Sequence, residues 1–336
     1  MKKTLIVAGV RFCPNCGTPV EPEYKFCPNC GSPLRAEEAR KPRGFTLQDV
    51  PRSPETRVGE KFTVFIEGVS KDLRFDGSSV QKFKKVPLEE ALRLFSTLPR
   101  SYPEGFTPDE KTKLLIFQVG TVQPLSIGLR LDKAGAYDIL GRISRVIYGR
   151  GLFARFWIKD VDYNTACEAI KRYYTESDFV ENVFKAQERW VQEEEKGKYM
   201  AKIPCAVPIH HKGEFLERFL YGGLYAMGDG LALWPTSFGS YEPKRLPDDI
   251  RRMPFEPVKI KGLIRLEIWM AEGLCHLPFN AVKKAKVKVK DAKMEMKYVD
   301  PRGKKRDIDF YFLIKEDVPK FCQAITPYLA DRLKIK

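Results

Sequence analysis

Residues 12–34 read FCPNCGTPVEPEYKFCPNCGSPL and repeat one unit, Phe-Cys-Pro-Asn-Cys-Gly-x-Pro, on either side of a short polar spacer. Each unit contains a C-x2-C pair, Cys13 with Cys16 and Cys27 with Cys30. A glycine follows each second cysteine, which suits a tight turn that brings two sulfur atoms to one side. The stretch therefore presents four thiolates from two similar turns.

Four thiolates form a closed tetrahedral set for one structural Zn²⁺, with Zn–S bonds of roughly 2.3 Å. Because no position is left for water, we expect no zinc catalysis. A module this small has almost no core, so metal binding would supply most of its folding free energy. Disulfides or free thiols are the alternative, but the repeat, the spacing and the flanking Pro and Gly favour a metal.

The repeat resembles the zinc-ribbon family in its double CPxCG form, over residues 12–34. The resemblance implies a small zinc-binding domain over residues 1–34. Zinc ribbons bind nucleic acid, bind proteins or cap a chain end, so the resemblance does not by itself select a function.

The composition indicates a folded protein that favours polyanionic partners. The 336 residues are 43% hydrophobic and 31% charged, which excludes a largely disordered chain. The formal net charge of +15 favours RNA, DNA, a ribonucleoprotein or an anionic membrane surface. The same charge is also compatible with solubility alone.

The remaining cysteines indicate a reducing compartment. They are scattered and lie in apolar surroundings, as expected for buried thiols: Cys167, Cys205, Cys275 and Cys322. The apolar run at residues 5–10 is too short for a signal peptide, and no stretch is long enough to span a membrane. We therefore expect a cytoplasmic protein.

The middle of the chain predicts an α+β domain over residues 60–198, after a polar linker at residues 35–59. Hydrophobic periodicity predicts strands at 62–66, 113–119, 126–131 and 153–158. It predicts helices at 87–98, 132–147, 162–174 and from Ser177 to about 197, with Asp132 capping the second.

The C-terminal part, residues 212–336, predicts an antiparallel sheet closed by a helix. The sequence predicts a hairpin turning at 228–230 and strands at 258–270, 274–279 and 282–290, with a further hairpin turning at 300–303. A helix begins at Asp317, with an apolar stripe of Val318, Phe321, Cys322, Ile325 and Leu329.

This order of strands and helix resembles the PH/GRAM-like fold, apart from an insert at residues 236–257. The resemblance implies a scaffold that binds lipid head groups, proteins or other ligands. The expected fold class is thus α+β: an N-terminal zinc ribbon, a mixed middle domain and a PH-like domain.

The sharpest surface pattern is KKAKVKVK at residues 283–290. Alternation places four lysines on one face of a strand: Lys284, Lys286, Lys288 and Lys290. The nearby turn adds Arg302, Lys304, Lys305 and Arg306. These residues form either a phosphate-contacting surface or a solvated face that prevents strand aggregation.

A second basic and aromatic stretch lies at residues 142–157. Phe153, Phe156 and Trp157 lie beside arginines, and such aromatics can stack on nucleic-acid bases. At strand spacing, however, they are more often part of a core.

The sequence contains few candidates for acid–base chemistry. His210 and His211 lie near Cys205 without further ligands at helical spacing, and His276 lies in a predicted strand, so all three histidines are interpreted as structural. No phosphate-binding loop, dinucleotide fingerprint or hydrolase motif is present, and we assign no catalytic residue.

The sequence therefore predicts a non-catalytic zinc-ribbon adaptor that docks basic surfaces on a polyanion, foremost RNA or a ribosome-like particle. The alternative is a PH-like adaptor that binds a membrane surface or a protein partner. A third hypothesis is an enzyme with an unrecognised site in the middle domain.

Overall fold

A computed structural model describes residues 6–7, 10–12, 19–20, 44–147, 150–209, 218–237, 239–247, 250, 252–254 and 273–336. The chain divides into two compact units, Met1–Gly44 and Phe45–Lys336. The first contains a small antiparallel sheet of β1 (Ile6–Val7), β2 (Val10–Phe12) and β3 (Pro19–Val20). The predicted strand at 258–270 lies outside the described residues.

The second unit begins with a six-stranded antiparallel sheet in the order β5-β4-β6-β7-β8-β9. Its strands are β4 (Phe62–Val69), β5 (Phe75–Val86), β6 (Ile116–Val119), β7 (Leu125–Leu129), β8 (Tyr137–Ile147) and β9 (Arg150–Val161). Apolar residues alternate along these strands and are buried on one face, as at Phe117, Ile127 and Ile139.

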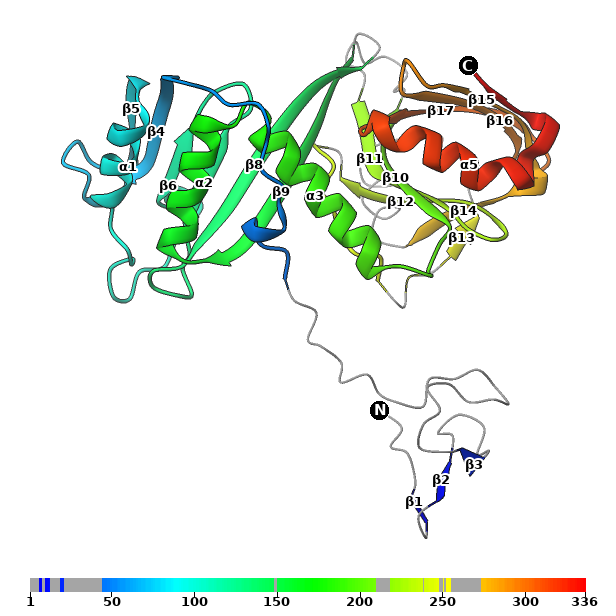
Figure 1. Cartoon of the computed structure of the whole chain (residues 1–336), viewed down its shortest axis with the longest axis horizontal. Coiled ribbons are helices and arrows are strands. Elements are labelled where there is room, and N and C mark those ends of the chain that lie inside the picture. Colours follow the sequence, from blue (N-terminus) through cyan, green and yellow to red (C-terminus); the bar gives the residue numbers. More distant parts are fainter. Residues whose placement is uncertain are drawn as a thin grey trace. The chain divides into compact units, whose positions relative to one another are not determined.

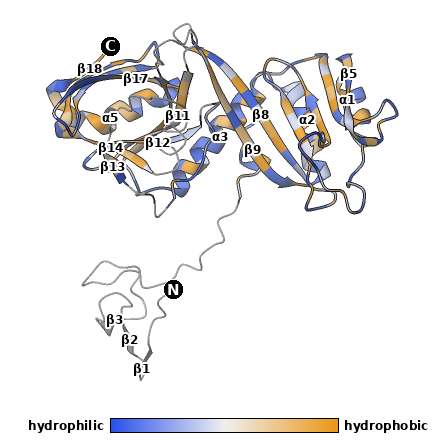
Figure 2. Cartoon of the chain, turned by 180° about the vertical axis from the view of Figure 1, so that it is seen from behind, coloured by the Kyte–Doolittle hydropathy of each residue, from blue (hydrophilic) through white to orange (hydrophobic). Residues whose placement is uncertain are grey.

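Three helices cover that buried face: α1 (Leu88–Ser96), α2 (Tyr163–Thr175) and α3 (Phe179–Glu194) (Figure 1). The helices predicted at 87–98 and 162–174 are confirmed, and the Asp162 carboxylate caps α2 by accepting from the Thr165 N–H at 2.7 Å. The helix predicted from Ser177 to about 197 is present as α3, but its N-cap is Asp178 and not Ser177. Seen from behind, none of the described helices lies in front of β8 and β9 (Figure 2). Among the residues that the structure describes, no helix covers this second face of the sheet, which we call the helix-free face.

The helix predicted at 132–147 is wrong, because these residues contain β8. Burial there follows a period of two: Tyr137, Ile139 and Ile143 are buried, whereas Arg142 is exposed. Isoleucine and valine favour strands, and Gly141 lies where a side chain would overlap the Phe156 ring on the paired strand β9. Pairing with β7 and β9 thus overrides the capping signal at Asp132.

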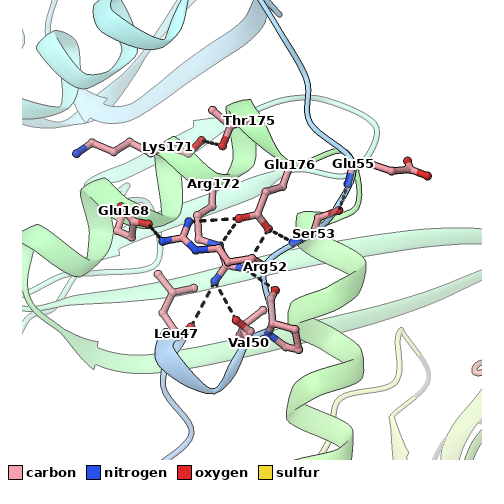
Figure 3. Close-up of polar contacts among 11 residues, drawn as sticks. Leu47, Val50, Arg52, Ser53, Glu55, Glu168, Lys171, Arg172, Thr175 and Glu176 are labelled. Carbon is pink, nitrogen blue, oxygen red and sulfur yellow. Dashed lines mark hydrogen bonds and ion pairs between the residues drawn. The ribbon is translucent and has the colours of Figure 1, made fainter.

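The segment at 45–57 is held against α2 by Arg172 and Glu176 (Figure 3). Both side chains are buried and pair with each other at 2.6 Å. Arg172 donates to the Val50 carbonyl at 3.3 Å, and Glu176 accepts from the Ser53 N–H at 3.2 Å. The structure differs here from the expected linker at 35–59, because its later residues pack with the second unit; residues 35–43 lie outside the described part.

A nine-stranded sheet forms the rest of the second unit, in the order β13-β14-β12-β11-β10-β17-β16-β15-β18. Its strands are β10 (Ala201–Ile209), β11 (Arg218–Ala226), β12 (Gly230–Ser237), β13 (Arg252–Pro254), β14 (Leu274–Pro278), β15 (Val282–Lys288), β16 (Lys293–Val299), β17 (Lys305–Phe312) and β18 (Leu333–Ile335). The sheet begins at Ala201, earlier than the expected boundary at 212, since β10 pairs with both β11 and β17.

The C-terminal helix α5 (Val318–Leu329) packs into this sheet (Figure 1). Its predicted stripe is confirmed, because Val318, Phe321, Cys322, Ile325 and Leu329 are all buried. Both predicted hairpins are also confirmed, at β11–β12 and β16–β17. Short 3₁₀ turns lie at Leu47–Asp49, Phe279–Ala281, Lys315–Asp317 and Ala330–Arg332.

The segment that follows β12 of the nine-stranded sheet pairs with the edge of β9 in the six-stranded sheet. Tyr241 exchanges backbone hydrogen bonds with β9, donating to the Phe153 carbonyl at 3.0 Å and accepting from the Arg155 N–H at 2.8 Å. The described residues thus form an α+β protein that is mostly strand, with a helix after its last long strands. None of the described helices is long and apolar enough to cross a membrane.

Candidate polyanion interface

The lysine face of β15 has the predicted orientation. Ala285 and Val287 are fully buried against α5, and Lys284, Lys286 and Lys288 point to the opposite side. The strand ends at Lys288, so the prediction that Lys290 lies on it is wrong, and Lys290 lies in the following turn. Three of the four lysines therefore share the outer face of the sheet.

Carboxylates on the neighbouring strands neutralise one end of this face. Glu295 on β16 lies 2.7 Å from Lys288, 3.1 Å from Lys293 and 3.8 Å from Lys286. Hydrogen bonding to Lys288, and then to Lys293, lowers the pKa of Glu295 to about 2. The lysine face is thus a mixed-charge surface here, which the sequence of β15 alone did not indicate.

The other end of the face retains its positive charge. Lys284 lies directly opposite Lys297 on β16. Lys305, the first residue of β17, lies opposite Val299, which is two residues beyond Lys297 on β16. Lys297 has a distant partner, Asp307 at 3.8 Å, and both side chains are largely exposed. We call the exposed lysines at this end the basic corner: Lys283, Lys284, Lys297, Lys304 and Lys305.

The turn between β16 and β17 is organised by Asp300. Its carboxylate accepts from the N–H groups of Arg302 at 3.0 Å and Lys304 at 2.8 Å, and from the Arg306 guanidinium at 2.9 Å. Arg306 is therefore engaged in holding the turn. The structure brings Lys304 and Lys305 to the same end of the sheet as Lys284, which joins two basic clusters that are separate in the sequence.

The basic and aromatic stretch at 142–157 divides between two faces of the six-stranded sheet. Phe156 is buried beneath the helices, as the core interpretation expects. Phe153 and Trp157 lie half-buried on the helix-free face, where the Arg142 guanidinium stands 4.4 Å from the centre of the Phe153 ring. The core interpretation is thus confirmed for Phe156, whereas Phe153 and Trp157 do not belong to that core.

A polar cluster that sequence reasoning missed surrounds His276. Asp229 lies 3.1 Å from the His276 imidazole and 3.0 Å from the Arg252 guanidinium. Burial raises the pKa of Asp229, but the charges and hydrogen bonds of these partners lower it overall. A cavity of about 650 Å³ adjoins the cluster and is lined in part by Asn280 and Lys283. In the sequence, only the predicted hairpin turn at 228–230, which contains Asp229, pointed to this cluster.

The predicted zinc ligands lie outside the described residues: Cys13, Cys16, Cys27 and Cys30. His210 and His211 also lie outside them. Cys205 is fully buried, and burial raises the pKa of its thiol. Within the described ranges, no cluster of three or more His, Cys, Asp or Glu side chains could hold a metal ion.

Comparison with known proteins identifies one segment of the chain. Residues 12–34 match the model of the zinc-ribbon domain family. No curated protein matches the chain. The match covers both C-x2-C pairs and supports zinc binding by the N-terminal unit, and zinc ribbons serve in nucleic-acid or protein binding.

Proposed function

We propose that this protein is a non-catalytic adaptor that docks on a nucleic-acid polyanion, foremost RNA or a ribonucleoprotein such as a ribosome-like particle. The observation that carries the proposal is the basic corner. Like charges directly opposite on paired strands, as at Lys284 and Lys297, destabilise a sheet unless they are solvated or face an anion. A phosphate backbone would supply that anion.

The zinc ribbon is the second part of the proposal. We infer that the four cysteines of residues 12–34 hold one structural Zn²⁺, because two C-x2-C turns provide a closed set of four thiolates. The ion would fold the N-terminal unit and do no chemistry. The zinc-bound N-terminal unit would add a second contact with the nucleic acid or with an associated protein.

The test is binding of full-length, zinc-loaded protein to RNA and DNA at increasing salt. Lysine–phosphate contacts release counterions, so affinity should fall linearly with salt on a double logarithmic scale. Absence of binding at about 50 mM salt, or binding without salt dependence, would overturn the proposal.

The second candidate function is a PH-like adaptor for an anionic membrane surface or a protein. The topology favours it: a four-stranded meander joins a three-stranded one through β10 and β17, and α5 packs against both. Flotation with anionic vesicles separates the two functions. A membrane adaptor would float, and a variant with Lys284, Lys286, Lys288 and Lys290 changed to Ala would not.

A cytoplasmic location completes the proposal. Cys167, Cys205, Cys275 and Cys322 are free thiols, which suits a reducing compartment.

A further inference from the structure

One row of side chains crosses all six strands of the first sheet on its helix-free face. Each member lies directly opposite the next on the neighbouring strand: Lys82, Phe65, Gln118, Ser126, Leu140 and Trp157. A neighbouring part of the same face contains Phe153, opposite Ser144. Large aromatic rings thus lie near both edges of this face.

Each of these aromatic rings has a cationic group over it. The Lys82 ammonium stands 5.3 Å from the centre of the Phe65 ring, and the Lys159 ammonium stands 4.6 Å from that of Trp157. Arg142 covers Phe153 at 4.4 Å. The three cationic side chains are exposed and the three rings are half-buried. Exposed cation–aromatic contacts are weak, so the cations can leave the rings for a stronger partner.

This composition differs from that of an ordinary solvated sheet face, which alternates apolar residues inside with polar ones outside. Near both edges of this face, outer positions carry aromatic and basic residues together, with Gln118 and Ser126 between them. Arg155 on the same face is paired with a carboxylate, that of Glu242 at 3.0 Å. Lys82, Arg142 and Lys159 have no carboxylate within 4 Å among the residues that the structure describes. Aromatic faces stack on bases, and nearby cations bind phosphates.

We propose that the helix-free face of the six-stranded sheet binds single-stranded nucleic acid. Bases stack on Phe65, Phe153 and Trp157, while Lys82, Arg142 and Lys159 contact phosphates. The proposal rests on the proposed function and adds a second surface to the basic corner. Stacking requires unpaired bases, since the bases of a duplex already stack on each other, so single strands are the expected ligand.

The spacing of the rings suits several nucleotides. Phe65 on β4 and Trp157 on β9 are four strand positions apart, which corresponds to about 19 Å at the usual strand separation. Phe153 lies four residues from Trp157 along β9, or about 13 Å. A strand of about 12 nucleotides is a suitable probe, within the usual range of site sizes for such surfaces.

The experiment compares Trp157→Leu with Trp190→Leu in full-length, zinc-loaded protein. Trp190 is the matched control, because it is also half-buried and has a cation over its ring, with the Arg245 guanidinium 4.7 Å from the ring centre. It lies on α3 and not on the helix-free face. Binding of a labelled, unstructured RNA is followed by fluorescence anisotropy and by quenching of tryptophan emission. Thermal unfolding confirms that both variants are folded.

We expect Trp157→Leu to weaken binding about fivefold or more and to remove most of the quenching. Trp190→Leu should retain both. If Trp157→Leu retains wild-type affinity and quenching, or if a duplex of the same sequence binds more tightly, the stacking proposal is overturned although salt-dependent binding remains. An unchanged affinity with altered sedimentation would assign this face to a second copy of the chain and would overturn the stacking proposal as well. Absence of all binding would overturn the proposed function itself.

Discussion

The ammonium group of Lys202 on β10 lies 3.1 Å from the carboxylate of Glu188 on α3, and the two side chains are 1% and 0% exposed. Glu188 also accepts from the Tyr241 hydroxyl at 2.7 Å. Burial and the nearby Glu188 raise the pKa of Tyr241, so the hydroxyl remains a donor. This buried cluster links α3, which covers the six-stranded sheet, to β10 of the nine-stranded sheet.

Changing Lys202 to Met should therefore destabilise the second unit strongly. The substitution leaves a buried carboxylate without its counter-charge, and we expect a loss of about 3–5 kcal/mol in the free energy of unfolding, measured with urea. Lys196→Met is the control. Lys196 pairs with Glu193 at 3.7 Å on the surface, and its loss should cost less than about 1 kcal/mol. Equal effects of the two changes would contradict the assigned role.

Gly120→Ala should destabilise the six-stranded sheet. Gly120 has a φ of +83°, and a Cβ there would overlap the Tyr173 hydroxyl, which donates to the Gln123 carbonyl at 3.0 Å. Gly105→Ala is the matched control, since its φ of +73° imposes similar strain in open space. Strain of this kind costs about 1–3 kcal/mol, and Gly120→Ala should exceed the control by the cost of displacing Tyr173. Calorimetric unfolding of both variants provides the measurement.

Acid should remove the contribution of Glu295 to stability. The pKa of Glu295 falls from 4.5 to about 2 on folding, so its contribution is present above about pH 4.5 and is lost as the pH falls toward 2. We expect wild type to melt at a higher temperature than Glu295→Gln near pH 6, with the difference shrinking between pH 4.5 and 2. A difference that does not change with pH would show that Glu295 is not held as an anion by Lys288.

Neutralising the basic corner should reduce the salt dependence of RNA binding. Changing Lys284, Lys304 and Lys305 to Ala removes three phosphate contacts, and the slope of log affinity against log salt should fall by about 2 for a single strand. The control changes three exposed lysines elsewhere, Lys71, Lys111 and Lys171. Both variants lose the same net charge, so a slope reduced equally in both would assign the effect to overall charge and not to this corner.

The N-terminal unit should bind one zinc ion per chain, measured by elemental analysis. Changing Cys13 and Cys16 to Ser should abolish binding, because two thiolates cannot complete the tetrahedral set. The unfolding transition of residues 45–336 should remain unchanged, since these residues form a compact unit of their own. Changing the buried thiol of Cys322 to Ser leaves the metal content as in wild type and serves as the control. Zinc retained by the double variant would assign the ion to other ligands.

Local sequence patterns predicted much of the nine-stranded sheet and of the helix that packs on it. The stripe on α5, the β16–β17 turn and the alternation of β15 follow from residues close together in sequence, and each is present in the structure. The strand at Tyr137–Ile147 was missed, because Asp132 imitates a helix cap and only pairing with β7 and β9 decides the outcome. The packing of residues 45–57 was missed because it depends on Arg172, more than a hundred residues away in sequence.

The sequence alone determined the zinc-ribbon match, because a metal site of two C-x2-C turns is encoded within 23 consecutive residues. It also determined that β15 presents lysines to one side. Only the tertiary structure decided which lysines are paired with a carboxylate, since Glu295 lies on the neighbouring strand. It alone aligned Phe65 with Trp157 across the sheet. Charge pairing and rows of side chains depend on strand register, which is set by long-range packing and not by local sequence.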